Sequence, residues 1–326
     1  MRVGRYILYG AGGIGASLGA QLAQAGRSVL LIARGAQLAA IESRGLDYAT
    51  PEGRVRLRLP IVAHPGEVDF RAGDVAVLAM KTQDSLPAIE ALAAVAGSTL
   101  PVLCAQNGVE NERLALRRFE RVVGMAVWIP ATFVEAGSVR NHAAHAPIEL
   151  GRVPIGDDPL VDAVALDLRA AGFEAEARAD VLVWKYAKLL TNAVSTLDAI
   201  CGGRAGLEDV CARIRGEGAA CYRAAGIAAV PAAEYEARVA FAVAAMREIE
   251  GFPRGGGSSA QSLVRGAGSI ETDYINGEIV MLGRLHGVAT PVNAAIQRAA
   301  NELAAGRDGR VISGAELRAR IAAQAS

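Results

Sequence analysis

Net charge is the first property that this sequence lacks. Among its 326 residues, Lys and Arg total 34 and Asp and Glu also total 34, so the formal charge at pH 7 is zero. Proteins that bind nucleic acid or an anionic membrane surface usually carry a positive field that attracts phosphate groups. The balanced charge therefore argues against nucleic acid and membrane surfaces as partners.

Cysteine is also scarce, and its positions are not those of a metal site. The four cysteines are Cys104, Cys201, Cys211 and Cys221. They form no CxxC pair and have no histidine at ligand spacing, a pattern typical of reduced, buried thiols in a cytosolic protein. His142 and His145 are close in sequence, but they fall in an expected turn and lack a third candidate ligand. We therefore expect no metal.

Long apolar runs are absent as well. No run approaches the roughly 18 residues of a membrane span. The first apolar segment begins within a few residues of Met1, which leaves no room for a signal peptide. From these features and the cysteine pattern we expect a cytoplasmic protein.

Glycine is abundant instead, at 37 residues, and its most informative cluster follows the first apolar run. Gly10 permits a tight turn, Gly12 lets backbone N–H groups approach a pyrophosphate, and Gly15 lets the next helix pack on the strand. A second apolar run, Val29–Ala33, follows at the spacing of a βαβ unit. The expected dinucleotide-binding turn consists of Gly10, Ala11, Gly12, Gly13, Ile14 and Gly15.

The residue after that second run indicates which dinucleotide binds. An acidic residue there would accept hydrogen bonds from the ribose of NAD, whereas this chain has Arg34. A guanidinium can pair with a 2′-phosphate in a bidentate fork, so we predict NADP as the cofactor. The alternative is that Arg34 is a solvated loop residue that opens the next helix.

Apolar runs and helical segments alternate in the first half of the chain. This alternation predicts an α/β fold with a doubly wound, Rossmann-type parallel sheet. The expected strands are 6–9, 29–33, 75–79, 102–105 and 122–129. A hairpin around Gly137 and a strand at 148–150 indicate an antiparallel extension of this sheet. From about Asp180 the pattern is helical, so we predict an NADP-binding domain over 1–179 and an all-helical substrate domain over 180–326.

Polar residues follow two of the expected strands, where ligands bind in doubly wound folds. Lys81 comes after one strand, and Gln106-Asn107-Gly108 comes after the next. The ammonium and the amide could hold the nicotinamide ribose and a substrate carboxylate. The alternative is that each segment only forms a turn.

Two segments of the helical half also carry polar residues. Lys188, Asn192 and Thr196 are spaced by four residues, so they share one face of a helix. Farther on, Ser259 precedes a helical stretch that contains Glu271. The alternatives here are a solvated helix face and a surface carboxylate.

With these residues, the chain resembles the ketopantoate reductases over essentially its whole length. The shared landmarks are the glycine turn with a basic residue after the second strand, Lys81, the Gln106-Asn-Gly108 turn, Lys188 with Asn192, and Glu271-Thr-Asp-Tyr-Ile-Asn-Gly277 followed by Thr290-Pro-Val-Asn293. These enzymes are NADP-dependent, have two domains and reduce a 2-oxo acid to the 2-hydroxy acid. The resemblance therefore implies this activity, with ketopantoate as the first substrate, and it makes a homodimer plausible.

The resemblance also implies roles for single residues. Lys188 would be the general acid that protonates the carbonyl oxygen, and Glu271 would bind the hydroxyl end of the substrate and help to order that lysine. The remaining substrate contacts would be Asn107, Asn192, Ser259 and, where the family has a second Asn, Thr196. Lys81, Asn107 and Glu271 would also lie against the cofactor. A lysine suits general acid catalysis if burial lowers its pKa toward the working pH.

Departures from the family pattern leave alternatives open. Thr196 is shorter than the usual Asn, and Ser259 is followed by Ala-Gln-Ser-Leu rather than Met-Leu-Gln-Asp. The loop after Lys81 also reads Thr-Gln-Asp. These changes favour a different 2-oxo acid as one alternative. A non-catalytic NADP-binding sensor is another, although it would not need Lys188, Asn192 and Glu271 together.

Overall fold

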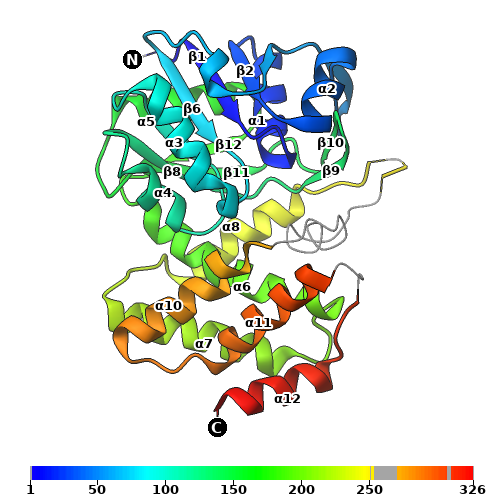
Figure 1. Ribbon diagram of the computed structural model, residues 1–326, viewed down its shortest axis with the longest axis vertical. Helices are drawn as coiled ribbons and strands as arrows, with labels where there is room; N and C mark the ends of the chain where they lie inside the picture. Colours follow the sequence, from blue (N-terminus) through cyan, green and yellow to red (C-terminus); the bar gives the residue numbers. More distant parts are fainter. Residues whose placement is uncertain (1, 250, 253–269, 307–309, 326) are drawn as a thin grey trace. The chain divides into compact units, whose positions relative to one another are not determined.

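The computed structural model describes residues 2–249, 251–252, 270–306 and 310–325. The chain forms two compact units that interleave along the sequence (Figure 1). Unit 1 comprises Met1–Gln106, Glu110–Lys185 and Pro231–Arg254, and unit 2 comprises Asn107–Val109, Tyr186–Val230 and Gly255–Ser326.

The main sheet of unit 1 has eight strands in the order β12-β11-β8-β7-β6-β1-β2-β5. Their bounds are β1 Arg5–Tyr9, β2 Val29–Ile32, β5 Ile61–Val62, β6 Asp74–Leu78, β7 Val102–Cys104, β8 Val122–Val127, β11 Pro147–Arg152 and β12 Glu174–Ala177. The six strands from β5 to β8 are parallel, and β11 is antiparallel to β8. The predicted parallel sheet with an antiparallel extension is therefore confirmed.

Helices cover both faces of this sheet, as a doubly wound fold requires. Successive residues of a strand point to opposite faces, and here Val77 and Leu78 belong to different core clusters. The first cluster includes residues of α1 (Gly13–Gln24) and α5 (Pro159–Ala170), and the second includes residues of α3 (Ser85–Ala96). Because both faces are buried, the central strands are continuous apolar runs, which made them recognisable in the sequence.

A second, four-stranded sheet has the order β4-β3-β10-β9. Its strands are β3 Leu46–Thr50, β4 Gly53–Leu57, β9 Ala131–Glu135 and β10 Ser138–Asn141. The predicted hairpin around Gly137 is the antiparallel pair β9–β10. It lies in this separate sheet rather than in the extension of the main sheet, because β10 pairs in parallel with β3.

Helix α1 lies between the two sheets. It contacts β1 and β2 of the main sheet and β3, β9 and β10 of the second sheet. All residues from Gly15 to Leu22 are buried as a result, including the polar Ser17 and Gln21. Gln21 donates hydrogen bonds to the carbonyls of Ala144 and Ala171, so its burial leaves its amide N–H groups paired.

The other helical segments of unit 1 connect or flank these strands. They are α2 Gly35–Arg44, η1 Pro65–Glu67, η2 Thr82–Asp84, α4 Glu110–Ala115 and α8 Ala232–Ala244. Although α8 follows helices of unit 2 in sequence, it contacts β11. The buried carboxylate of Glu149 on β11 accepts hydrogen bonds from Arg238 (2.6 Å) and Arg178 (2.7 Å), which attaches α8 to the sheet. Burial nevertheless raises the pKa of Glu149.

All regular secondary structure described in unit 2 is helical, as predicted for the C-terminal domain. Its segments are α6 Val181–Cys201, of which the part from Tyr186 belongs to this unit, α7 Glu208–Ala225, η3 Glu271–Tyr274, α10 Asn276–His286, α11 Pro291–Gly306 and α12 Gly314–Ala325. They enclose one core that includes Leu189, Ile214, Ile279, Ile296 and Leu317. A Cβ at Gly218 would lie 2.3 Å from Leu190 Cδ2, so α7 packs closely on the Leu190 side chain of α6 at this glycine.

Candidate active site

The glycine turn joins β1 to α1 with backbone contacts that exclude side chains at two positions. Gly10 has a φ of +103°, and a Cβ there would lie 2.7 Å from the backbone N of Met80. A Cβ at Gly15 would lie 2.0 Å from the carbonyl O of Gly10. Both glycines therefore serve the tight turn and the close packing of helix on strand.

Gly12 differs, because a Cβ there would meet no described atom within 4 Å. It is the N-cap of α1, a helix whose first N–H groups have no acceptor within the helix. Such an end attracts phosphate through its N–H groups and its dipole. The open space beside Gly12 is therefore suited to a pyrophosphate, and the turn fits a dinucleotide.

The remaining residues of the turn have structural contacts. The carbonyl of Ala11 accepts a hydrogen bond from Gln37 Nε2 at 2.6 Å, and the carbonyl of Gly13 accepts one from Ser17 Oγ at 2.7 Å. Ile14 packs against the core of unit 1. These contacts fix the turn before any ligand binds.

Arg34 lies two residues after the end of β2, at the N-cap position of α2. Its side chain is 84% exposed, and its Nη2 lies 2.9 Å from Oδ1 of Asp84. Asp84 belongs to η2, which starts directly after Lys81. The sequence offered no signal for this partner, because the two residues are 50 positions apart.

In unit 2, Lys188 contacts Asn107, which is followed by Gly108. Its Nζ donates a hydrogen bond to Asn107 Oδ1 at 2.5 Å. Gly108 has a φ of +76°, and a Cβ there would lie 3.0 Å from the carbonyl O of Tyr274 in η3. The same short helix begins with Glu271, which is buried. The turn thus packs against α6 and against the segment that carries Glu271.

Asn192 and Thr196 continue the face of α6 that begins with Lys188, but their surroundings differ. Asn192 Nδ2 is buried and has no hydrogen-bond acceptor among the residues that the structure describes. Thr196 is 1% exposed, and its hydroxyl donates to Asn276 Oδ1 at 2.8 Å. Asn192 therefore keeps a donor available, whereas the hydroxyl proton of Thr196 is used inside the helical core.

Asn276 and Asn293, two landmarks of the resemblance, have structural contacts. Asn276 Nδ2 donates to Asn293 Oδ1 at 3.0 Å, and Asn293 Nδ2 donates to Glu217 Oε2 at 2.7 Å. Glu217 also accepts from the backbone N–H groups of Val292 and Asn293, so it caps α11. This network joins α6, α7, α10 and α11. Ser259 lies outside the described residues.

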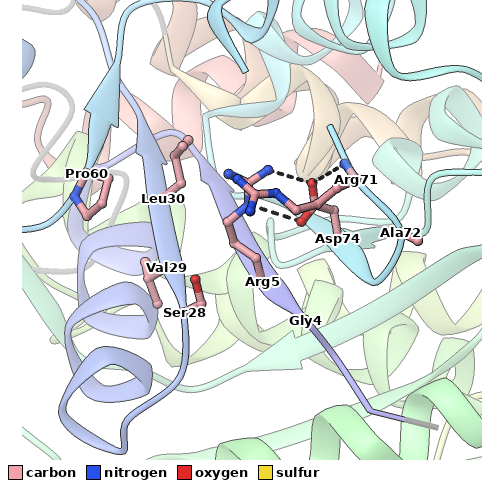
Figure 2. Close-up of a pocket in the computed structure, with 9 residues that line it drawn as sticks. All are labelled: Gly4, Arg5, Ser28, Val29, Leu30, Pro60, Arg71, Ala72 and Asp74. Carbon is pink, nitrogen blue, oxygen red and sulfur yellow. Dashed lines mark hydrogen bonds and ion pairs between the residues drawn. The ribbon is translucent and has the colours of Figure 1, made fainter. Parts of the chain in front are cut away.

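A cavity of about 400 Å³ opens at the opposite end of the parallel strands (Figure 2). Its lining residues are Gly4, Arg5, Ser28, Val29, Leu30, Pro60, Arg71, Ala72 and Asp74. Figure 2 shows the Arg5 guanidinium paired with the Asp74 carboxylate, with an Nη2 to Oδ2 distance of 2.6 Å. Ligands of doubly wound folds bind at the carboxyl ends of the strands, so this cavity is distinct from the expected cofactor site.

The described part of the chain shows no group of three His, Cys, Asp or Glu side chains that could hold a metal ion. None of its helices is both long and apolar enough to cross a membrane. All four cysteines are free.

Comparison with known proteins adds sequence relatives. A family model described as ketopantoate reductase PanE/ApbA matches residues 6–154, and the model for the C-terminal part of this family matches residues 180–304. A 2-dehydropantoate 2-reductase of Mycobacterium tuberculosis is 30% identical over 295 residues, or 88% of this chain and 93% of that protein. One of Pyrococcus horikoshii is 28% identical over 300 residues, again 88% and 93%.

Solved structures give the same fold. A PanE/ApbA family ketopantoate reductase of Ralstonia eutropha has a TM-score of 0.79 at 28% identity, and the match covers 93% of this chain and 99% of that chain. D-mandelate dehydrogenase with NADH and anilino(oxo)acetate has a TM-score of 0.80 at 22% identity, with the same coverage. The second similarity concerns the fold alone.

Proposed function

Because the chain belongs to the ketopantoate reductase family, we propose that it uses NADPH to reduce a 2-oxo acid, and that the substrate is 2-dehydropantoate (ketopantoate). Its class is that of an oxidoreductase that acts on a CH–OH group with a nicotinamide cofactor. The observation that carries the proposal is the hydrogen bond from Lys188 to Asn107, which gives the required acid a fixed orientation.

The chemistry explains why an ammonium is needed at that point. A bound reduced nicotinamide supplies a hydride, which adds to the carbonyl carbon and leaves negative charge on the carbonyl oxygen. Lys188 Nζ gives a proton to that oxygen and becomes a neutral amine, which is later reprotonated from solvent. The amide oxygen of Asn107 holds the ammonium in place before the transfer.

Further residues support a site for a 2-oxo acid. The buried amide donor of Asn192 lies one helical turn after Lys188, where it can donate to a substrate oxygen. Glu271 is buried in η3, against which the Asn107 turn packs, and we assign it to the hydroxyl end of the substrate. Ser259 is assigned by the family pattern to the same ligand.

We assign the cofactor to the glycine turn and its preference to Arg34. The open space beside Gly12 accommodates the pyrophosphate, and Lys81 follows β6 at the same carboxyl edge of the sheet. A guanidinium suits the 2′-phosphate of NADPH. The pairing of Arg34 with Asp84 partly offsets this preference.

One observation favours a different 2-oxo acid as an alternative substrate. In place of the family's second asparagine, this chain has Thr196, and its hydroxyl proton is used by Asn276. Thr196 is shorter than asparagine, and its hydroxyl already donates a hydrogen bond to Asn276, so it can contribute less to binding the far end of 2-dehydropantoate. A substrate with an apolar far end would lose less binding free energy through the replacement of asparagine by threonine.

The test follows NADPH absorbance with 2-dehydropantoate and a panel of 2-oxo acids that includes benzoylformate, the oxo acid corresponding to mandelate. We expect the unmodified protein to reduce at least one of these 2-oxo acids. The turnover of that substrate should be about 100-fold to 10,000-fold lower in Lys188→Ala. Lys188→Arg should be as inactive, since a guanidinium keeps its charge but does not release a proton. NADPH binding should persist in both variants.

Other results would lead to other conclusions. Turnover in Lys188→Arg close to that of the unmodified protein would exclude Lys188 as the acid. NADPH binding without turnover of any panel member would favour a non-catalytic NADP-binding sensor.

We also propose that the protein is cytoplasmic, as the pattern of its cysteines predicts, and that it forms a homodimer, as the family resemblance implies. Light scattering coupled to gel filtration tests the second point, with twice the mass of one chain as the expected result. A mass equal to that of one chain would exclude the dimer under the conditions used.

A further inference from the structure

Lysine occupies only three positions in this chain, Lys81, Lys185 and Lys188, although Lys and Arg together number 34. Elsewhere the chain uses arginine for its positive charges. Two of the three lysines already have roles in the proposed site. The third, Lys185, lies one turn before Lys188 on α6 and has no role in the reaction described above.

Lys185 is buried in unit 1 and holds two oxygen atoms. Its side chain is 2% exposed, and it forms an ion pair with Glu112 of α4, whose side chain is 1% exposed. The same Nζ donates a hydrogen bond to the backbone carbonyl of Gln106 at 3.1 Å. Glu112 Oε2 has no hydrogen-bond partner among the described residues, so the carboxylate depends on Lys185.

Burying this ion pair costs desolvation free energy, which argues that the pair does more than pack the interior of unit 1. Burial raises the pKa of Glu112, and the Lys185 ammonium opposes that rise. A buried ion pair often contributes no more stability than an apolar pair of similar volume. An apolar pair, however, could not bind the carbonyl of Gln106.

The Gln106 side chain extends the network to the neighbouring loop. Its Nε2 donates to Ser85 Oγ at 2.9 Å, and Ser85 donates to Asn111 Oδ1 at 2.6 Å. Asn111 in turn donates to Thr82 Oγ1 at 3.1 Å. Thr82 follows Lys81 directly, so the network fixes the loops after both β6 and β7.

We propose that Lys185 and Glu112 are positioning residues, which fix the Gln106 carbonyl so that the next residue, Asn107, holds the ammonium of Lys188. This inference rests on the proposed function for its effect on turnover. The two lysines thus bind two consecutive residues of one turn, Lys185 through the backbone of Gln106 and Lys188 through the side chain of Asn107.

The first test replaces both members of the pair at once, as Lys185→Met with Glu112→Leu. Removing one charge would leave the other buried and unpaired, which could unfold the protein. We expect kcat to fall by about 10-fold to 100-fold, as for a misplaced catalytic group, with little change in the KM for NADPH. The matched control is Arg5→Met with Asp74→Leu, a buried pair at the amino ends of β1 and β6. The control should keep its kcat.

A double-mutant cycle then separates positioning from general destabilisation. If the pair acts through Asn107, adding Asn107→Ala to the pair variant should lower kcat no further than Asn107→Ala alone. The proposal would be overturned if the fold-losses of kcat in the pair variant and in Asn107→Ala multiplied when the substitutions were combined. An unchanged kcat in the pair variant would also overturn it.

A measurement without substrate keeps this inference separate from the proposed function. The rate of acetylation of Lys188 by acetic anhydride can be read by peptide mass spectrometry, since so few lysines compete. We expect the pair variant and Asn107→Ala to increase this rate by the same factor, because each removes the hydrogen bond to Asn107. An unchanged rate in the pair variant would overturn the inference, whereas failure of the unmodified protein to reduce any 2-oxo acid would overturn only the proposed function.

Discussion

At the scale of single residues, the candidate site combines groups that the sequence could reveal with partners that it could not. Lys188 and Asn107 were recognisable because each belongs to a local pattern, and the structure brings them to 2.5 Å. The partners Asp84 of Arg34 and Asn276 of Thr196 are 50 and 80 positions away. Such pairs arise from tertiary packing, which local spacing does not encode.

The Arg34–Asp84 pair leads to a prediction about cofactor choice. Asp84→Asn removes a carboxylate that competes with the 2′-phosphate for Arg34 and repels it. The pair is exposed and screened by solvent, so we expect the ratio of kcat/KM for NADPH to that for NADH to rise only about twofold to fivefold. Steady-state kinetics with both cofactors measure this ratio.

Arg34→Met provides the control for that measurement. It should lower the ratio, and adding Asp84→Asn should then raise it less than in the unmodified background. A ratio that falls in Asp84→Asn would contradict the proposed competition between Asp84 and the 2′-phosphate for Arg34.

At the scale of elements, burial decided what could be predicted. The central strands of the main sheet are buried on both faces and read as apolar runs, so most of them were found. β3 and β4 were missed because they carry charged residues, such as Asp47 and the arginines of Gly53–Leu57. Asp47 is stabilised by Arg140 of β10, 93 residues away. The second sheet therefore depends on an ion pair that only the folded chain assembles.

Two positions of the glycine turn allow effects on stability to be separated from effects on NADPH binding. Gly15→Ala places a Cβ against the Gly10 carbonyl and should lower the free energy of unfolding by about 1–3 kcal/mol. Gly12→Ala meets open space and should leave stability unchanged, while its methyl group occupies the space suited to the pyrophosphate. Thermal unfolding and NADPH titration of both variants provide the two readouts. Unchanged NADPH affinity in Gly12→Ala would argue against pyrophosphate binding beside Gly12.

At the scale of the whole molecule, both the α/β unit and the helical unit follow from the periodicity of the sequence. What periodicity did not indicate is that β9 and β10 form a second sheet with β3 and β4. It also did not indicate that α8 packs on β11 after the chain has passed through the helices of unit 2. Both features depend on buried charges, at Asp47 and at Glu149, whose partners are distant in sequence.

The ion pairs of the second sheet predict how stability depends on pH. Burial alone would raise the pKa of Asp47, but hydrogen bonds from Arg54 and Arg140 outweigh it and hold the pKa well below its ordinary value of 3.8. The charged form is therefore favoured by folding, and its contribution is present above pH 3.8 and lost as the pH falls toward the lower, folded-state pKa.

Asp47→Asn should accordingly lower the free energy of unfolding by about 3 kcal/mol at neutral pH. The difference from the unmodified protein should shrink as the pH falls below 3.8. Denaturant unfolding at a series of pH values measures this dependence. Asp209→Asn, which breaks an exposed pair with Arg318, should have little effect. A difference that is constant with pH would show that the charge of Asp47 is not the cause.

The position of α1 between two sheets has a consequence for protein engineering. A helix that is covered on both sides has no face on which substitutions are free of packing cost, and Gly15 to Leu22 are all buried. Libraries designed to change the cofactor should therefore leave α1 constant and vary the exposed positions Arg34 and Asp84. The helix to whose N-terminus we assign the cofactor pyrophosphate would then serve as a rigid reference, against which altered specificity can be selected without loss of the fold.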